Sequence, residues 1–162
     1  MPPAPADEPP AHPGVPFPPP LLFVAGFGAG MVLERLLPRP ALGLPARLVV
    51  FIAALLAMLG ITVLVWAVRT FRRARTGIYP TQPASQIVSS GPYRFSRNPM
   101  YVGMSLLYVA LALWTHALWA LPLLPFVLWG LWRIVIRREE RYLAAAFGIA
   151  YTEYTRRVRR WL

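Results

Sequence analysis

The groups that could do chemistry lie at the two ends of one uncharged stretch. Residues 99–132 carry no charge, with Arg94 and Arg97 shortly before the stretch and Glu139-Glu140 shortly after it. The stretch is too long for one membrane crossing and about right for two, because a spanning helix needs roughly 20 apolar residues. Both sets of charges then meet at one membrane face. Paired carboxylates near anionic lipid are unfavourable unless a cation is bound, so we expect an arginine or a cationic ligand beside Glu139 and Glu140.

The residue types exclude several kinds of catalysis. The chain has no cysteine and only two histidines, His12 and His116, so we expect no disulfide, no cysteine nucleophile and no metal site built by the protein. It also lacks a His-Asp or Cys-His constellation for hydrolysis or acyl transfer. The net charge of +11 comes from arginines clustered beside apolar runs. That arrangement is typical of the positive-inside bias of membrane proteins and argues against nucleic acid as a partner.

Composition and hydropathy predict the fold class. Of the 162 residues, 57% are hydrophobic, and the mean hydropathy of +0.49 is too high for an ordinary soluble domain. We expect an all-α integral membrane protein with about four transmembrane helices, a helical hairpin and a C-terminal amphipathic cytosolic helix. The first two helices are predicted at residues 21–33 and 48–68. The first of these could instead be tilted or half-inserted.

Local signals divide the uncharged stretch into the hairpin. Asn98 is a good N-cap and Pro99 suits the first helical position, so a helix is predicted from Pro99 to about Trp114. Thr115-His116 is the expected turn, and the second helix should run through Ile136.

The chain divides into three regions by composition. Residues 1–20 hold more than half of the 19 prolines and predict a disordered or polyproline arm. Residues 21–75 should form two transmembrane helices. Residues 76–162 contain the loop, the hairpin and the tail, a region that a family resemblance implies to be the cofactor-binding core.

The distribution of arginines predicts the topology. The segment between the second and third helices, residues 69–98, and the tail from Arg133 onward carry most of the 17 basic residues. An even number of spans puts both on one side, and the positive-inside bias makes that side cytoplasmic. Arginine-rich usage without lysine favours a bacterial source, and hence the inner membrane.

The tail has one apolar face along a predicted helix. The residues of this face recur at steps of three or four and are Leu143, Phe147, Tyr151, Tyr154 and Val158. An interfacial helix that anchors to anionic lipid is one interpretation. Gly148 is expected to allow a bend or a close contact.

The last part of the chain resembles the isoprenylcysteine carboxyl methyltransferase family, which is related to the phospholipid N-methyltransferases. The family pattern appears here in order and with matching spacing, as Gly91-Pro92-Tyr93, Arg97-Asn98-Pro99, Tyr101, Gly103, Glu139-Glu140 and Phe147-Gly148-Ile149-Ala150-Tyr151-Thr152-Glu153-Tyr154. Asn98 stands where the isoprenylcysteine enzymes usually have histidine, and asparagine there is more like the phospholipid-methylating relatives.

The resemblance implies an integral membrane enzyme that binds S-adenosylmethionine near the cytosolic ends of its last helices. Glu140, or Glu139, would hold the cofactor's ammonium group, and Arg97 or Arg94 would hold its carboxylate. The helix N-terminus at Asn98-Pro99 also suits that carboxylate. The implied cofactor-binding residues are Tyr93, Arg94, Arg97, Asn98, Pro99, Tyr101, Gly103, Glu139, Glu140, Tyr151 and Tyr154, with Arg97 and Asn98 as catalytic residues.

Several of these residues have structural alternatives. Tyr93 and Tyr101 could be headgroup-level aromatics of the membrane belt. Arg97 could form an ion pair with Glu139 or Glu140 only, and Gly103 could serve close helix packing.

The expected function is that of a membrane-embedded methyltransferase acting on a lipid-soluble small molecule, an isoprenoid carboxylate or a lipid headgroup. The partners are then the bilayer and a lipophilic methyl acceptor, while the sequence leaves the oligomeric state open. An NADPH-dependent membrane reductase of the sterol-reductase type and a non-enzymatic membrane scaffold are the alternatives.

Overall fold

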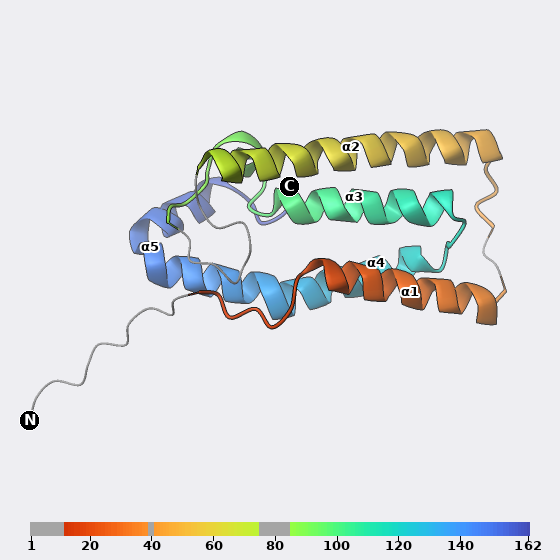
Figure 1. Ribbon diagram of the computed structural model, residues 1–162, viewed down its shortest axis with the longest axis horizontal. Coiled ribbons are helices and arrows are strands. Elements are labelled where there is room, and N and C mark those ends of the chain that lie inside the picture. Colours follow the sequence, from red (N-terminus) through yellow and green to blue (C-terminus); the bar gives the residue numbers. More distant parts are fainter. Residues whose placement is uncertain (1–11, 39–40, 75–84) are drawn as a thin grey trace, which may run out of the picture.

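The computed structural model describes residues 12–38, 41–74 and 85–162 of the chain. Within these residues the protein is helical and contains no strand. Helices α1, α2, α3 and α4 lie roughly parallel, with α1 against α4 and α2 against α3 (Figure 1). The expected all-α class is confirmed, and the start of α3 lies at the same end of the molecule as the turn-back of α5 (Figure 1).

The first two helices are longer than the sequence predicts. Helix α1 spans Pro20–Leu36 and α2 spans Ala46–Arg73. A proline stands at or just before the start of each, where the missing N–H costs nothing because no intrahelical partner exists there. Helix α2 continues through Arg69 to Arg73 because arginine is a good helix former and the last turn of a helix favours cations.

The start and the end of α3, Pro99–Trp114, confirm the predicted positions. Thr115 follows as the C-cap, and His116 takes a positive φ of 55° in the expected turn. Asn98 does occupy the N-cap position, but its side chain makes no capping hydrogen bond. A one-turn 3-10 helix, η1, Gly91–Arg94, precedes α3.

The second arm of the hairpin and the tail form one continuous helical run. Helix α4, Ala120–Leu131, passes through the π-helical turn η2, Trp132–Ile136, into α5, Arg137–Arg157. The predicted second helix reaches Ile136 but does not end there, because the run continues into the charged residues of α5, and a first charge, Arg133, already lies in η2. Gly148 interrupts α5 with φ 50° and ψ −119°. The bend expected at Gly148 is therefore present, and it turns the end of α5 back towards α2 and α3 (Figure 1).

Small residues allow the close helix contacts. A Cβ added to Gly103 of α3 would lie 3.0 Å from the carbonyl oxygen of Gly60 in α2, and one added to Gly30 of α1 would lie 2.5 Å from Ala120 Cα of α4. These two positions bring the paired backbones together without side chains between them. The structure thus supports the packing alternative for Gly103.

The prediction of a disordered arm over residues 1–20 is wrong for residues 12–19, which the structure describes. Val15 is buried in the core with Leu131, Val135 and Ile136, and Nη1 of Arg138 donates to the carbonyl oxygen of Gly14 at 2.6 Å. Proline content suggested a free segment, but one valine between prolines supplies an apolar anchor. Residues 1–11 lie outside the described residues.

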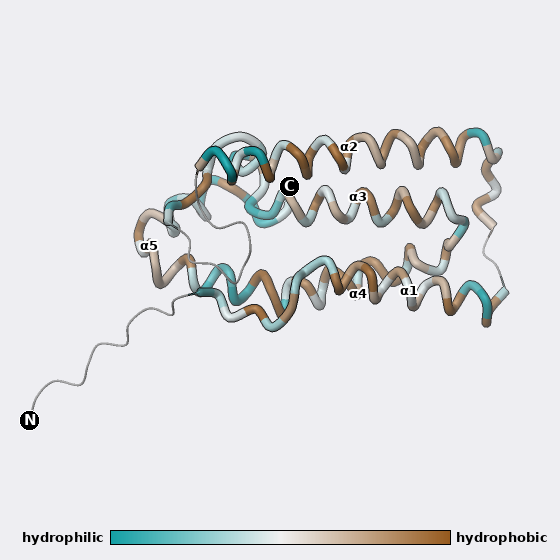
Figure 2. The backbone as a smooth tube through the Cα atoms, viewed as in Figure 1, coloured by the Kyte–Doolittle hydropathy of each residue, from teal (hydrophilic) through white to brown (hydrophobic). Residues whose placement is uncertain are grey.

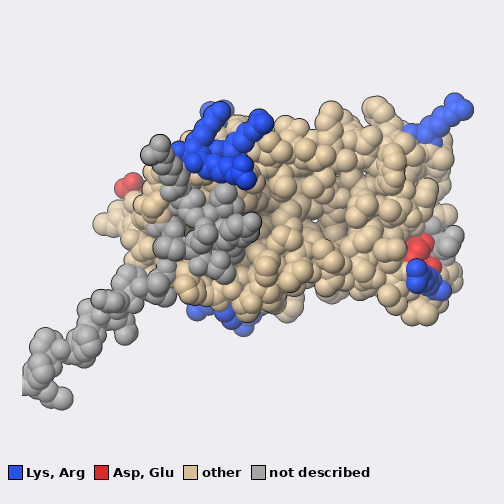
Figure 3. Space-filling view, viewed as in Figure 1, with Lys and Arg blue, Asp and Glu red and all other residues tan. Residues whose placement is uncertain are grey.

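Among the described residues, two helical runs are long and apolar enough to cross a membrane, Ala46–Arg73 and Ala120–Arg157, and Pro99–Trp114 is a shorter apolar helix. Along the rods the hydrophobic residues lie mainly in the middle, and the most hydrophilic residues lie towards the ends (Figure 2). On the face in Figure 3 the charged side chains gather towards the two ends. Exposed residues such as Phe51 and Met58 on α2 have no polar role and suit contact with lipid.

Candidate functional site

The loop before α3 is fastened to the C-terminal segment through backbone atoms. The N–H of Arg97 donates to the carbonyl oxygen of Arg159 at 2.9 Å, and Nδ2 of Asn98 donates to the carbonyl oxygen of Arg160 at 2.9 Å. The buried Ser96 supports both, because its Oγ accepts from the N–H of Asn98 at 3.1 Å and donates to Arg160 at 3.4 Å. Asn98 therefore positions the tail instead of capping α3.

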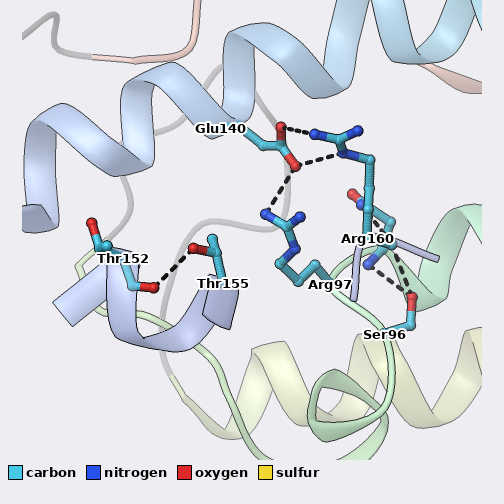
Figure 4. Close-up of polar contacts among 7 residues, drawn as sticks. Ser96, Arg97, Glu140, Thr152, Thr155 and Arg160 are labelled. Atoms are coloured by element: carbon cyan, nitrogen blue, oxygen red, sulfur yellow. Dashed lines mark hydrogen bonds and ion pairs between the residues drawn. The ribbon is translucent and has the colours of Figure 1, made fainter. Parts of the chain in front are cut away.

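Arg97 and Arg160 converge on the carboxylate of Glu140 (Figure 4). Nη1 of Arg97 lies 3.0 Å from Oε1 of Glu140. Arg160 grips the same carboxylate bidentately, with Nε to Oε1 and Nη2 to Oε2 both at 2.9 Å. Hydrogen bonding to Glu140 raises the pKa of Arg160. The ion pair expected between Arg97 and a tail carboxylate is present, with a second arginine added.

Glu139 lies in a different environment from its neighbour. The hydroxyl of Tyr101 donates to Oε1 of Glu139 at 3.0 Å. Glu139 lies in α5, beyond the apolar part of the run, yet burial raises its pKa to about 7, with the Tyr101 hydrogen bond opposing that rise only in part. The two adjacent carboxylates thus differ: Glu140 is held by two cations, and Glu139 shares a hydrogen bond with a tyrosine.

The apolar face of the tail packs against the loop and forms an aromatic wall. Tyr151, Tyr154 and Val158 are buried in one cluster, with Leu143, Phe147 and Ile87 against it. The Tyr154 hydroxyl donates to the carbonyl oxygen of Tyr93 at 2.8 Å. Burial raises the pKa of Tyr93, Tyr151 and Tyr154, so all three stay neutral. The face predicted from the heptad-like spacing is therefore used for internal packing, and the lipid-anchor interpretation is not needed to explain it.

The structure brings together most, but not all, of the residues predicted for the site. Arg97, Asn98, Glu140 and the tail tyrosines meet at one end of the rods, and Pro99 is buried beside them. Arg94 is exposed and lies over the ring of Phe95, 4.5 Å from its centroid, with no carboxylate partner among the described residues. Gly103 lies one turn along α3 in the contact with α2.

Sequence reasoning missed Arg160 and Ser96. Arg160 belongs to a group of four tail arginines that look alike in sequence, so nothing marked it out from Arg156, Arg157 and Arg159. Only the chain reversal at Gly148 shows which of the four reaches Glu140. Ser96 has no distinguishing signal in the sequence.

The geometry suits a small molecule with both charges. Nε of Arg97 is buried and has no hydrogen-bond partner among the described residues, so it is a free donor for a carboxylate. Glu140 is a carboxylate whose partners are both side chains and hence exchangeable for a ligand cation. Tyr151 and Tyr154 supply aromatic faces nearby. The amino-acid head of S-adenosylmethionine requires a donor for its carboxylate and an acceptor for its ammonium group. Its sulfonium and its adenine require an aromatic ring. The residues present therefore fit that cofactor.

Comparison with known proteins decides the family. The profile of the family described as phospholipid methyltransferase matches residues 48–150, which is more than half of the chain. The chain belongs to the phospholipid methyltransferase family. The matched range includes α2 from its third residue onward, α3, α4 and both carboxylates of the site. The C-terminal contacts of Arg159 and Arg160 lie just beyond it.

Two curated proteins are similar to this phospholipid methyltransferase family member. Protein-S-isoprenylcysteine O-methyltransferase of Saccharomyces cerevisiae is 31% identical over 71% of this chain and 49% of its own length. The cobalt-zinc-cadmium resistance protein CzcN of Cupriavidus metallidurans is 38% identical over 44% of this chain and 32% of its own length. The chain thus spans about half of the first relative and about a third of the second. No solved structure matches the chain significantly.

Family membership and the long apolar helices together indicate an integral membrane protein. The resemblance seen in the sequence motifs is confirmed at the family level. It extends further towards the N-terminus than those motifs, because the matched range begins in α2.

Proposed function

We propose that this family member is an S-adenosylmethionine-dependent methyltransferase embedded in the membrane, acting on a lipid-soluble small molecule, an isoprenoid carboxylate or a lipid headgroup. One observation carries the proposal: Arg97 and Arg160 converge on Glu140 at the charged end of an apolar hairpin. That arrangement can hold a zwitterion at a membrane face, and the family to which the chain belongs supports methyl transfer as its purpose.

The proposal gives each residue a role. When bound, S-adenosylmethionine supplies a methyl group activated on a sulfonium. Glu140 receives the ammonium group of the cofactor, and Arg97 binds its carboxylate with the Nε donor that now lacks a partner. Asn98 holds the C-terminal segment in place through the carbonyl of Arg160. Tyr151 and Tyr154 line the site with neutral rings that a cation can contact.

The remaining catalytic work is alignment and exclusion of water. No general base is required when the acceptor is already an anion, and orientation alone can lower a barrier by several kcal/mol. The π-helical turn η2 stands directly before Arg137 and the two carboxylates. Such turns recur at functional sites because they shift the register of the side chains that follow.

The same proposal fixes the arrangement in the membrane. All four rods cross the bilayer, including α1 and α3, and the end that carries Arg97 and Glu140 faces the cytoplasm of a bacterium. Arginine is concentrated at that end, as the positive-inside bias requires. The acceptor reaches the site from the bilayer.

Cofactor binding tests the proposal directly. The purified full chain in detergent should bind S-adenosylmethionine in a calorimetric titration and should not bind NADPH. Glu140→Ala should remove most of the affinity, whereas Glu153→Ala, an exposed carboxylate on the same helix, should leave it unchanged. Binding of NADPH alone would favour a reductase. Binding of neither molecule would favour a membrane scaffold without enzymatic activity.

A further inference from the structure

The described residues ahead of α1 cross the helical run from α4 to α5 at its π-helical turn. Residues 12–19 form a strap beside η2 and the start of α5 (Figure 1). Nη1 of Arg138 donates to the carbonyl oxygen of Gly14 at 2.6 Å. The next residue of the strap, Val15, is 5% exposed and belongs to the buried cluster that contains Leu131 and Val135. The strap therefore has an apolar anchor at η2 and a polar contact just after it.

The strap is short and stiff. Prolines stand at positions 16, 18 and 19, and the first residue of α1 is Pro20. Because a proline ring fixes φ, a segment rich in proline acts as a semi-rigid spacer. Pro19 is buried, so the strap is also packed where it joins α1. Val15 is thus held at a fixed place relative to α1.

Helix α1 is also fixed to the part of the run that precedes η2. A Cβ added to Gly30 of α1 would lie 2.5 Å from Ala120 Cα, and one added to Gly26 would overlap Cγ2 of Val127. Both contacts are with α4, whereas the strap reaches η2 and the start of α5. Helix α1 therefore holds the run on both sides of the π-helical turn, directly before it and through the strap after it.

The register of the run changes at η2, and this turn needs support from outside. The N–H of Arg137 bonds to the carbonyl oxygen of Trp132, five residues back, where an α-helix uses the fourth. Nε1 of Trp132 is buried and has no hydrogen-bond partner among the described residues, which is unfavourable. Val135 and Ile136 are both fully buried, although adjacent residues of a helix point about 100° apart. Burying both requires cover on two sides of the helix, and Val15 supplies part of that cover.

The two carboxylates of the site follow this turn by three and four residues. The hydroxyl of Tyr101 lies 3.0 Å from Glu139, and the guanidinium of Arg97 lies 3.0 Å from Glu140. A change of one residue in the register at η2 would rotate both carboxylates by about 100° around the axis of α5. Neither contact would survive that rotation.

We propose that Val15 is a positioning residue of the site: together with Arg138 it holds η2 in its π-helical register and thereby places Glu139 and Glu140. The inference rests on the proposed function for the purpose of that placement, which is to receive the cofactor. The strap lies outside residues 48–150, which the family profile matches, so this support is a feature of the present chain.

Distances between spin labels test the register directly. The chain has no cysteine, so labels can be attached through Arg69→Cys in α2 and Arg141→Cys in α5, which are both exposed positions. Val15→Ala should add a second distance, shifted by roughly 3–8 Å, because a rotation of that size moves a side chain on the surface of a helix this far. Val24→Ala is the matched control, because it removes the same atoms from a residue that is 66% exposed. A single, unchanged distance in Val15→Ala would overturn the inference.

Titration with S-adenosylmethionine shows whether the placement matters for binding. Val15→Ala and Arg138→Gln should each weaken binding by about tenfold, the loss of one charge-assisted contact. Val15→Ile keeps the apolar anchor and should bind as the unchanged chain does, and so should Arg156→Gln, which removes an exposed charge from the same helix. Each titration is run well below the unfolding midpoint of the variant, so that unfolding does not contribute. Unchanged affinity in Val15→Ala and Arg138→Gln would overturn the positioning role.

The two measurements separate this inference from the proposed function. If the unchanged chain binds no S-adenosylmethionine, the proposed function fails, while a second distance in Val15→Ala still supports the strap as the support of η2. If the chain binds the cofactor and Val15→Ala changes neither the distance nor the affinity, the proposed function stands and the inference is wrong.

Discussion

Asn98 and Arg160 are neighbours in space: Nδ2 of Asn98 donates to the carbonyl oxygen of Arg160 at 2.9 Å, across 62 positions of sequence. The side chain of the same arginine turns the other way and grips Glu140. One residue of the C-terminal segment thus connects the start of α3 with α5. The geometry of the site depends on all three segments, and the variants below probe each of them.

The Arg97 guanidinium should contribute to cofactor affinity. Arg97→Ala removes the donor without a partner at Nε, and we expect S-adenosylmethionine binding to weaken by about 1.5–3 kcal/mol, the worth of a hydrogen bond to a charged group. A calorimetric titration measures the change. Arg94→Ala is the matched control, because Arg94 is exposed and lies over Phe95. Unchanged affinity in Arg97→Ala would leave the arginine as a structural ion-pair partner only.

Asn98→Ala should loosen the C-terminal segment. The variant loses one hydrogen bond to a backbone carbonyl, and the expected cost is about 1 kcal/mol of stability. Limited proteolysis should then cut the segment after α5 faster than in the unchanged chain, while the interior of α3 stays protected. Equal rates of cleavage would show that the other contacts of the segment, among them the backbone contact between Arg97 and Arg159, hold it without the side chain of Asn98.

Stability should depend on pH through Glu139. The folded pKa is about 7 against an ordinary value of 4.5, so between these values the folded chain holds more protons than the unfolded chain. Stability therefore falls as the pH rises through this window and levels off above it, by on the order of 1–3 kcal/mol in total. Thermal unfolding in detergent from pH 4.5 to 8 measures the slope. Glu139→Gln should flatten that slope, and a slope that persists in the variant would assign it to another group.

Gly103→Ala should weaken the contact between α2 and α3. The new methyl would lie 3.0 Å from the carbonyl oxygen of Gly60, so the helices must move apart, at a cost of about 1–3 kcal/mol. Gly28→Ala is the control, because nothing lies within 4 Å of a Cβ added there. Comparing the two midpoints of thermal unfolding measures the difference. Cofactor binding that is lost without any loss of stability would instead assign Gly103 to the site.

The sequence predicted the parts of the fold that depend on local signals. Asn98-Pro99 marked the start of α3, and Trp114 with Thr115-His116 marked its end, because capping preferences and proline geometry act within one turn of the chain. Gly148 marked the bend for the same reason, since glycine adopts a positive φ at little cost. Family motifs then indicated that Arg97 and Glu140 belong together, and the structure shows their ion pair.

The rest depended on contacts between distant segments. Arg160 cannot be told from its neighbouring arginines until the tail has turned back. Burial of Val15 depends on where α4 and η2 lie. Arg94 and Arg97 lie about one turn apart in the sequence, yet only Arg97 faces the carboxylates. The side chain of Asn98 had two uses open to it, and the carbonyl of Arg160 was the better partner than the N-terminus of α3.

The helical run from Ala120 to Arg157 is continuous up to Gly148. The second arm of the hairpin and the first half of the tail therefore move together. Thickening or thinning of the surrounding bilayer tilts a spanning helix, and here the helical run carries that tilt through η2 to Glu139 and Glu140. Lipid chain length should therefore tune how tightly the two carboxylates close on their partners, which makes the geometry of the site sensitive to the thickness of the surrounding membrane.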